Sequence, residues 1–173
     1  MTITVEHNVT AGAGSLLGLG CQPPAYTGNS AHQCMNEPDG HSNIIVNGNV
    51  TGTDANTVLL NGITVGKNVT LTGGGGDIPW SVKNNTIGGN LTVGEVTADW
   101  FGALFNQISG NATLTNITAT DPGNPTPTVY VVRNTIGRNL NCMGLGPYVS
   151  GGFIPDEVNT VGRNANGQCA SLV

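Results

Sequence analysis

A short pattern of apolar and polar positions recurs along the whole chain. Each copy starts with Val or Ile, reaches an Asn three residues later, and then places an apolar residue before a Thr or another polar residue. The copies are VEHNVTAG (5–12), VNGNVTGT (46–53), VGKNVTLT (65–72), IGGNLTVG (87–94), ISGNATLT (108–115), IGRNLNCM (136–143) and VGRNANGQ (161–168). Their shared Asn residues lie 41, 19, 22, 21, 28 and 25 positions apart, so the first interval is about two repeats long. Repeats of this length predict a solenoid of stacked coils.

The alternation within each copy predicts β-strands. The residue three before the Asn and the residue just after it are apolar in every copy, and both should point into a core because side chains alternate along a strand. We therefore predict an all-β fold, a single-domain parallel β-helix of about seven coils over residues 1–173. Residues 1–14 would form the first coil, 15–43 an inserted or capping loop, and 44–173 the remaining coils and a C-terminal cap.

The Gly-x-Asn part of the repeat predicts a corner between two strands. Gly and Asn tolerate left-handed backbone angles, and Asn side chains stacked from coil to coil should form a hydrogen-bonded ladder. One segment is ambiguous, because residues 97–108 fit either a short helix or the third side of one coil.

Composition and charge narrow the possible partners. The net charge of −5 argues against nucleic-acid binding, and no apolar run approaches the roughly 18 residues of a membrane helix, so no membrane insertion is expected. The even set of four cysteines favours an oxidising compartment, in which Cys21–Cys34 and Cys142–Cys169 are the local pairings. We predict no cofactor and no metal site, because the cysteines lack zinc-type spacing.

Three runs, NNTIGGNLTV (84–93), RNTIGRNLNC (133–142) and NTVGRNANGQC (159–169), resemble a known family. They are similar to the right-handed parallel β-helix repeats of uncharacterised secreted bacterial proteins, many of them actinobacterial. The resemblance covers residues 44–173. It implies a right-handed β-helix, an exported location and a terminal Cys142–Cys169 disulfide, and it implies no activity. Arg138 and Arg163 stand where the family usually has Gly.

An exposed threonine array is the most regular candidate for a binding surface. It comprises Thr51, Thr53, Thr70, Thr72, Thr92, Thr113 and Thr115. Such an array on a solenoid resembles the ice-binding faces of some antifreeze proteins. The alternative is a plain solvated face, since Thr is favoured at exposed strand positions.

Aromatic residues from neighbouring coils form a second candidate site. Trp80, Trp100, Phe101 and Tyr130 would stack on sugar rings if they gathered on the surface. The alternative is that they cover an open side of the solenoid or fill an irregular part of the core. No two acidic residues are expected to share an outward column, so cleavage by paired carboxylates is not favoured.

These observations lead to one main functional hypothesis. We expect an exported, non-enzymatic structural or surface-binding module, secreted or at the cell surface, whose partner is a glycan, another surface protein or further copies of the chain. Two alternatives stay open: a carbohydrate-binding or polysaccharide-cleaving β-helix, and an ice-binding protein that uses the threonine array. The two disulfides are expected to cap opposite ends of the solenoid, which argues against indefinite end-to-end stacking.

Overall fold

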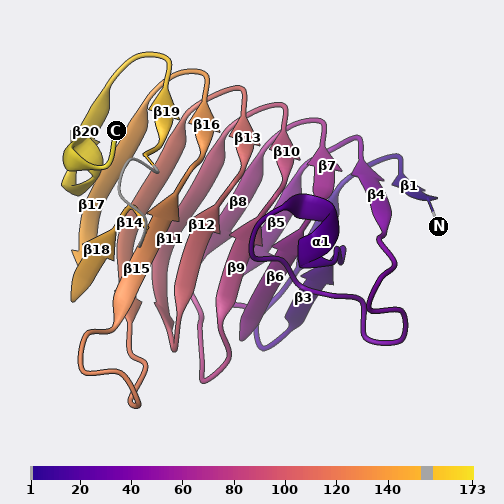
Figure 1. Cartoon of the computed structure of the whole chain (residues 1–173), viewed down its shortest axis with the longest axis horizontal. Coiled ribbons are helices and arrows are strands. Elements are labelled where there is room, and N and C mark those ends of the chain that lie inside the picture. The colour runs from indigo at the N-terminus through magenta and orange to yellow at the C-terminus, as the bar shows by residue number, and fades with distance from the viewer. Residues whose placement is uncertain (1, 153–157) are drawn as a thin grey trace.

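Three parallel sheets wrap around one core in the computed structural model, which describes residues 2–152 and 158–173 (Figure 1). Sheet A contains β1 (Thr2–Val5), β4 (Asn43–Val46), β7 (Ile63–Val65), β10 (Thr86–Ile87), β13 (Gln107–Ile108), β16 (Thr135–Ile136) and β19 (Thr160–Val161). Sheet B contains β2 (Val9–Ala11), β5 (Val50–Thr53), β8 (Val69–Thr72), β11 (Leu91–Ala98), β14 (Ala112–Ala119), β17 (Leu140–Gly146) and β20 (Ala165–Gly167). Sheet C contains β3 (Leu16–Leu19), β6 (Thr57–Asn61), β9 (Trp80–Lys83), β12 (Phe101–Leu104), β15 (Thr128–Val132) and β18 (Tyr148–Ser150).

Each coil takes one strand from each sheet in the order A, B, C, and equivalent strands of successive coils pair in parallel. The described residues form seven such coils, and the last has the 3₁₀ helix η1 (Gln168–Ser171) where the others have a sheet C strand. The predicted parallel β-helix is therefore confirmed. In the ambiguous segment 97–108, β12 is a strand of sheet C and no helix forms.

The two apolar columns of the repeat line the core, as expected. In the inner coils, none of these side chains is more than 3% exposed, for example Val46, Ile87 and Ile108 in sheet A. The equivalent residues of the first and last coils, such as Val5 and Val161, are only half-buried, because an end coil has a neighbour on one side only.

The predicted asparagine ladder runs along the corner between sheets A and B. Its rungs are Asn8, Asn49, Asn68, Asn90, Asn111, Asn139 and Asn164. Each Nδ2 donates to Oδ1 of the rung in the preceding coil, and that Oδ1 also accepts the backbone N–H, as for Asn90 and Asn68 at 3.2 and 2.9 Å. This exposed ladder fixes the register of neighbouring coils.

A second, buried asparagine ladder lies at the start of sheet A strands and was not anticipated. It consists of Asn85, Asn106, Asn134 and Asn159, each at most 2% exposed. Here the Nδ2 of every rung before the last donates to Oδ1 of the next coil, for example from Asn106 to Asn134 at 2.9 Å, and also to a backbone carbonyl. The signal was present in the sequence, since each of these residues stands five positions before an exposed rung.

The glycine at the Gly-x-Asn corner serves close packing, and the expected left-handed geometry was wrong. Gly66 and Gly88 do not have positive φ angles. A Cβ added to Gly88 would lie 2.6 Å from the carbonyl oxygen of Gly66, so glycine lets the backbones of successive coils approach each other. Left-handed residues form columns elsewhere, one of them on the outer bend of sheet B, where Asp54, Gly73 and Glu95 have φ angles of 51°, 70° and 58°.

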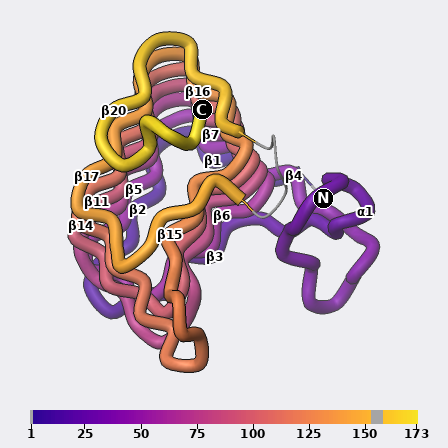
Figure 2. The backbone as a smooth tube through the Cα atoms, turned by 60° about the vertical axis from the view of Figure 1, so that its left-hand side comes forward, coloured from indigo at the N-terminus to yellow at the C-terminus, as the bar shows by residue number. Residues whose placement is uncertain are grey.

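The N-terminal insertion is shorter than predicted and lies on a side of the solenoid. Because β3 (residues 16–19) belongs to sheet C, the insertion begins at residue 20 and runs to residue 42, with helix α1 (Pro24–Thr27) and the Cys21–Cys34 disulfide. Figure 2 shows α1 and its loop projecting to one side of the stacked coils. The Asn29 side chain bonds that of Asn84, and the Gln22 side chain packs on Gly62. The expectation that this loop caps the first coil was therefore wrong.

The C-terminal cap is built as predicted, around the Cys142–Cys169 disulfide. Cys169 is fully buried in η1, and the Gln168 amide bonds both backbone groups of Leu145 at 2.7 Å. The carbonyl oxygen of Leu172 accepts the N–H and Nδ2 of Asn159 at 3.0 and 2.9 Å, as Oδ1 of a further rung would. The cap thus satisfies the last coil and ends the buried ladder.

Candidate functional site

The predicted threonine array forms on the outer surface of sheet B, and we call Thr51, Thr53, Thr70, Thr72, Thr92, Thr113 and Thr115 the threonine face. One column pairs in register through β5, β8, β11 and β14, as Thr51, Thr70, Thr92 and Thr113. A parallel column contains Thr53, Thr72 and Thr115, and Gly94 occupies its position in β11. All seven threonines are exposed or half-buried, because the alternating residues of the same strands fill the core.

Sheet geometry sets the spacing of the threonine face. Equivalent residues of successive coils lie about 4.8 Å apart, and residues two positions apart along a strand lie about 6.7 Å apart. None of the seven hydroxyl groups has a hydrogen-bond partner within the described part of the chain. The face therefore offers unpaired hydroxyl and methyl groups at regular positions, held by two asparagine ladders and a packed core.

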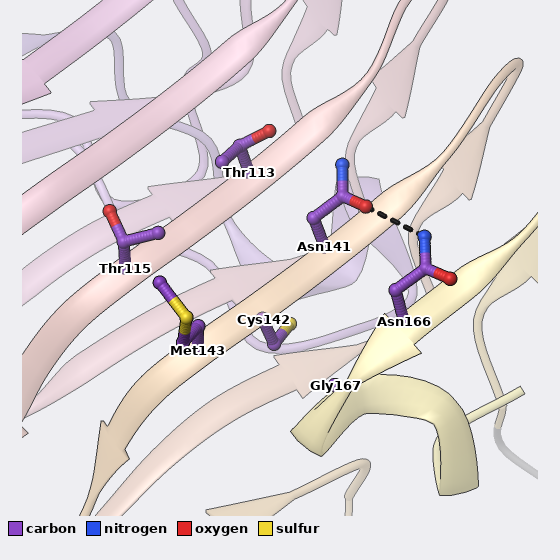
Figure 3. Close-up of a pocket in the computed structure, with 7 residues that line it drawn as sticks. All are labelled: Thr113, Thr115, Asn141, Cys142, Met143, Asn166 and Gly167. Carbon is purple, nitrogen blue, oxygen red and sulfur yellow. Dashed lines mark hydrogen bonds between the residues drawn. The ribbon is translucent and has the colours of Figure 1, made fainter.

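The threonine face ends in a shallow hollow over β14, β17 and β20 (Figure 3). This hollow has a volume of about 420 Å³ and is lined by Thr113, Thr115, Asn141, Cys142, Met143, Asn166 and Gly167. Asn166 Nδ2 donates to Asn141 Oδ1 at 2.8 Å, and Met143 is 66% exposed. Asn141, Met143 and Asn166 stand at positions where earlier coils have Thr, so this end differs in chemistry from the threonine face.

Two acidic residues share a column, contrary to expectation. Asp54 and Glu95 stand two coils apart on the bend of sheet B, with Gly73 between them. Two coil steps separate their backbones by about 10 Å. Glu95 Oε1 accepts Asn116 Nδ2 at 2.7 Å, and both acids occupy left-handed positions, so each has a local structural role at the bend.

The aromatic patch does not form as a surface site. Trp80 and Phe101 are 0% exposed and point into the core, so neither ring can stack on a sugar, and this part of the prediction was wrong. Trp100 stacks on Tyr130 with ring centroids 5.5 Å apart, and both pack with Leu104 and Val132 over the outer side of sheet C. The alternative interpretation, in which these residues fill the core or cover an open side, agrees with this arrangement.

The insertion contacts sheet C through one hydrogen bond and several buried polar atoms. The His32 carbonyl accepts Asn61 Nδ2 at 3.3 Å, whereas His32 Nε2 and Asn61 Oδ1 are buried without a bond to any described residue. Lys83 pairs with Asn61 across β6 and β9 and lies over the Trp100 ring at 5.1 Å. Burial lowers the pKa of Lys83, while burial and then the charge of Lys83 lower the pKa of His32. His32 is therefore neutral at pH 7.

Cys21 and Cys34 are joined in a disulfide, so the insertion has no thiolate that could bind a metal or act as a nucleophile.

Among the described helices, none is long and apolar enough to cross a membrane. Comparison with known proteins adds no relative: no family model, curated protein or solved structure matches this chain.

Proposed function

We propose that the protein is an exported, non-enzymatic binding module, and that its threonine face contacts an extended, uncharged and regularly repeating surface. The observation that carries this proposal is the pair of in-register threonine columns on sheet B. Hydroxyl groups that have no partner among the described residues are available to an external surface, and no charged side chain belongs to either column. A rigid array loses little conformational entropy on binding, which favours ordered targets.

Export is supported by covalent structure. Both disulfides, Cys21–Cys34 and Cys142–Cys169, join residues that are close in the fold, and such bonds persist in oxidising compartments. The low content of charged residues, 9%, fits a chain whose coils are held by amide ladders and apolar packing rather than by ion pairs. We place the protein outside the reducing cytosol, secreted or on the cell surface.

A depletion assay with insoluble targets tests the proposal. The purified protein is mixed with ice, crystalline cellulose or crystalline chitin, and the protein left in solution is measured. Wild-type protein should be depleted by at least one of these, and the Thr70→Tyr and Thr92→Tyr variants should not, because a bulky ring breaks the flat array. Thr64→Tyr is the matched control, since Thr64 is an exposed threonine of β7 in sheet A. Equal depletion of all variants, or of none including the wild type, would refute the role of the face.

Ice binding is a second candidate, and a specific observation favours it. Each threonine offers a hydroxyl and a methyl group, and the array repeats in two directions, about 4.8 Å along the solenoid and about 6.7 Å across it. Such a lattice is suited to an ordered water layer. Thermal hysteresis measured on the wild type, Thr70→Tyr and Thr64→Tyr proteins tests this candidate, and a wild type without hysteresis rules it out.

A further inference from the structure

Two arginines stand side by side on the corner between sheets A and B. Arg138 and Arg163 each precede a rung of the exposed ladder, Asn139 and Asn164, and the Arg163 N–H donates to the Arg138 carbonyl at 3.0 Å. They therefore occupy equivalent positions in adjacent coils, with backbones about 4.8 Å apart. Both side chains are exposed. We call them the arginine pair.

The charges of the arginine pair are not balanced within the described residues. Neither guanidinium has an ion pair or a side-chain hydrogen bond there, although the protein as a whole carries a net charge of −5. Two like charges held side by side repel each other. Two guanidinium groups at this separation are complementary to a single anion, because each presents a planar fork of donors to a carboxylate or phosphate.

The arginine pair stands just before the strands β17 and β20, which carry part of the hollow at the end of the threonine face. Asn141 and Asn166, which line the hollow, lie three residues after Arg138 and Arg163. Their mutual hydrogen bond leaves the Asn141 amide nitrogen and the Asn166 amide oxygen open to a ligand (Figure 3). The volume of about 420 Å³ lies within the range of small-ligand sites.

We propose that the arginine pair and the adjacent hollow bind a uronic acid residue of an acidic polysaccharide. The carboxylate lies between the two guanidinium groups. The sugar hydroxyls bond the free amide groups of Asn141 and Asn166 and the Thr113 hydroxyl. The exposed Met143 side chain packs against the C–H face of the ring.

The lining distinguishes this ligand class from other anions. The exposed surface of the hollow is mostly apolar, with a few amide and hydroxyl groups, which matches the C–H face and the hydroxyl groups of a sugar ring, whereas a simple carboxylate or phosphate would use the arginines alone. A nucleic acid, with its closely spaced phosphates, would be repelled by the overall negative charge. This site lies at the last coils and shares only Thr113 and Thr115 with the threonine face, and it does not rest on the function proposed for that face.

Isothermal titration of the full chain with oligogalacturonate tests the inference. Binding should weaken roughly tenfold or more in an Arg138→Gln/Arg163→Gln double variant, because the carboxylate loses both of its charged donors. Asn141→Ala should weaken it by a smaller factor. Lys67→Gln is the matched control, because Lys67 holds the same frame position between Gly48 and Gly89 of the neighbouring coils, and binding should stay within about twofold of wild type.

The ligand panel decides the chemistry. The methyl ester of the same oligosaccharide and free acetate should bind much more weakly than the uronate. The inference is wrong if wild-type protein does not bind oligogalacturonate at millimolar concentration, if the double variant binds as well as the wild type, or if dextran sulfate, which has no uronic acid, or DNA binds as tightly as the uronate. The Thr70→Tyr variant should bind uronate normally, so failure at one site can be told apart from failure at the other.

Discussion

Replacing Asn106 with alanine tests the buried asparagine ladder at a single position. Asn106 Oδ1 accepts the backbone N–H of Asn85 at 3.1 Å and its Nδ2 at 3.0 Å, and both donors are buried. The alanine variant leaves the Asn85 backbone N–H and one N–H of its Nδ2 without a partner, while the other Nδ2 hydrogen keeps its bond to the Leu60 carbonyl, and each unsatisfied group costs about 1–3 kcal/mol. The free energy of unfolding should therefore fall by about 2–6 kcal/mol, a large part of the stability of a typical domain.

The matched control is Asn90→Ala in the exposed ladder. Asn90 Oδ1 likewise accepts a backbone N–H and an Nδ2, both from Asn111, but at the surface water can replace it. That variant should lose about 1 kcal/mol. Urea unfolding followed by circular dichroism gives both values, and a change in the slope with urea would reveal that the coils unfold separately. If the two variants lose equal stability, burial of the second ladder has no special energetic role.

Three further predictions concern packing, pH and the terminal disulfide. Gly88→Ala should destabilise the protein by about 2–3 kcal/mol in urea unfolding, because the new Cβ meets the Gly66 carbonyl oxygen, whereas Gly12→Ala, which meets nothing within 4 Å, should have little effect. Because burial lowers the pKa of His32, the unfolded chain takes up a proton first as pH falls below about 6.5, so the melting temperature should drop on acidification and drop less in His32→Gln; an equal drop in both proteins would contradict this. Cys142→Ser/Cys169→Ser should lower the free energy of unfolding by about 3–4 kcal/mol, given a separation of 27 residues, and no loss would show that η1 docks without the bond.

The repeat made much of the architecture predictable. Apolar residues such as Val46, Ile87 and Leu91 recur at fixed positions of the repeat. A parallel stack of coils buries all of these positions together. The exposed ladder and the threonine columns followed from the same frame, because an equivalent position in every coil must lie in one line.

What could not be predicted depends on contacts between coils and not on position in the repeat. The glycine of the corner looked like a turn residue, but its role, close approach to the preceding backbone, depends on the spacing between two chains. Trp80 and Trp100 looked equivalent as aromatic residues, yet Trp80 lies in the core and Trp100 lies on the outer side of sheet C. The reason is their register: Trp80 pairs with Phe101, whereas Trp100 comes one residue before Phe101. The location of the insertion was equally inaccessible, because its contacts to Asn61 and Asn84 bridge residues far apart in the sequence.

The two ladders allow coils to be added or removed in the middle of the solenoid. Their amides donate in opposite directions, towards the preceding coil at the surface and towards the next coil in the interior. A duplicated internal coil would add one rung to each ladder, and every coil would keep the same types of hydrogen bond to its neighbours. A coil added after the last one would instead displace Gln168 and the Leu172 carbonyl from their bonds. Gene duplication in the middle of the chain is thus the route by which relatives with more or fewer coils, and a longer or shorter threonine face, could arise without a new terminus.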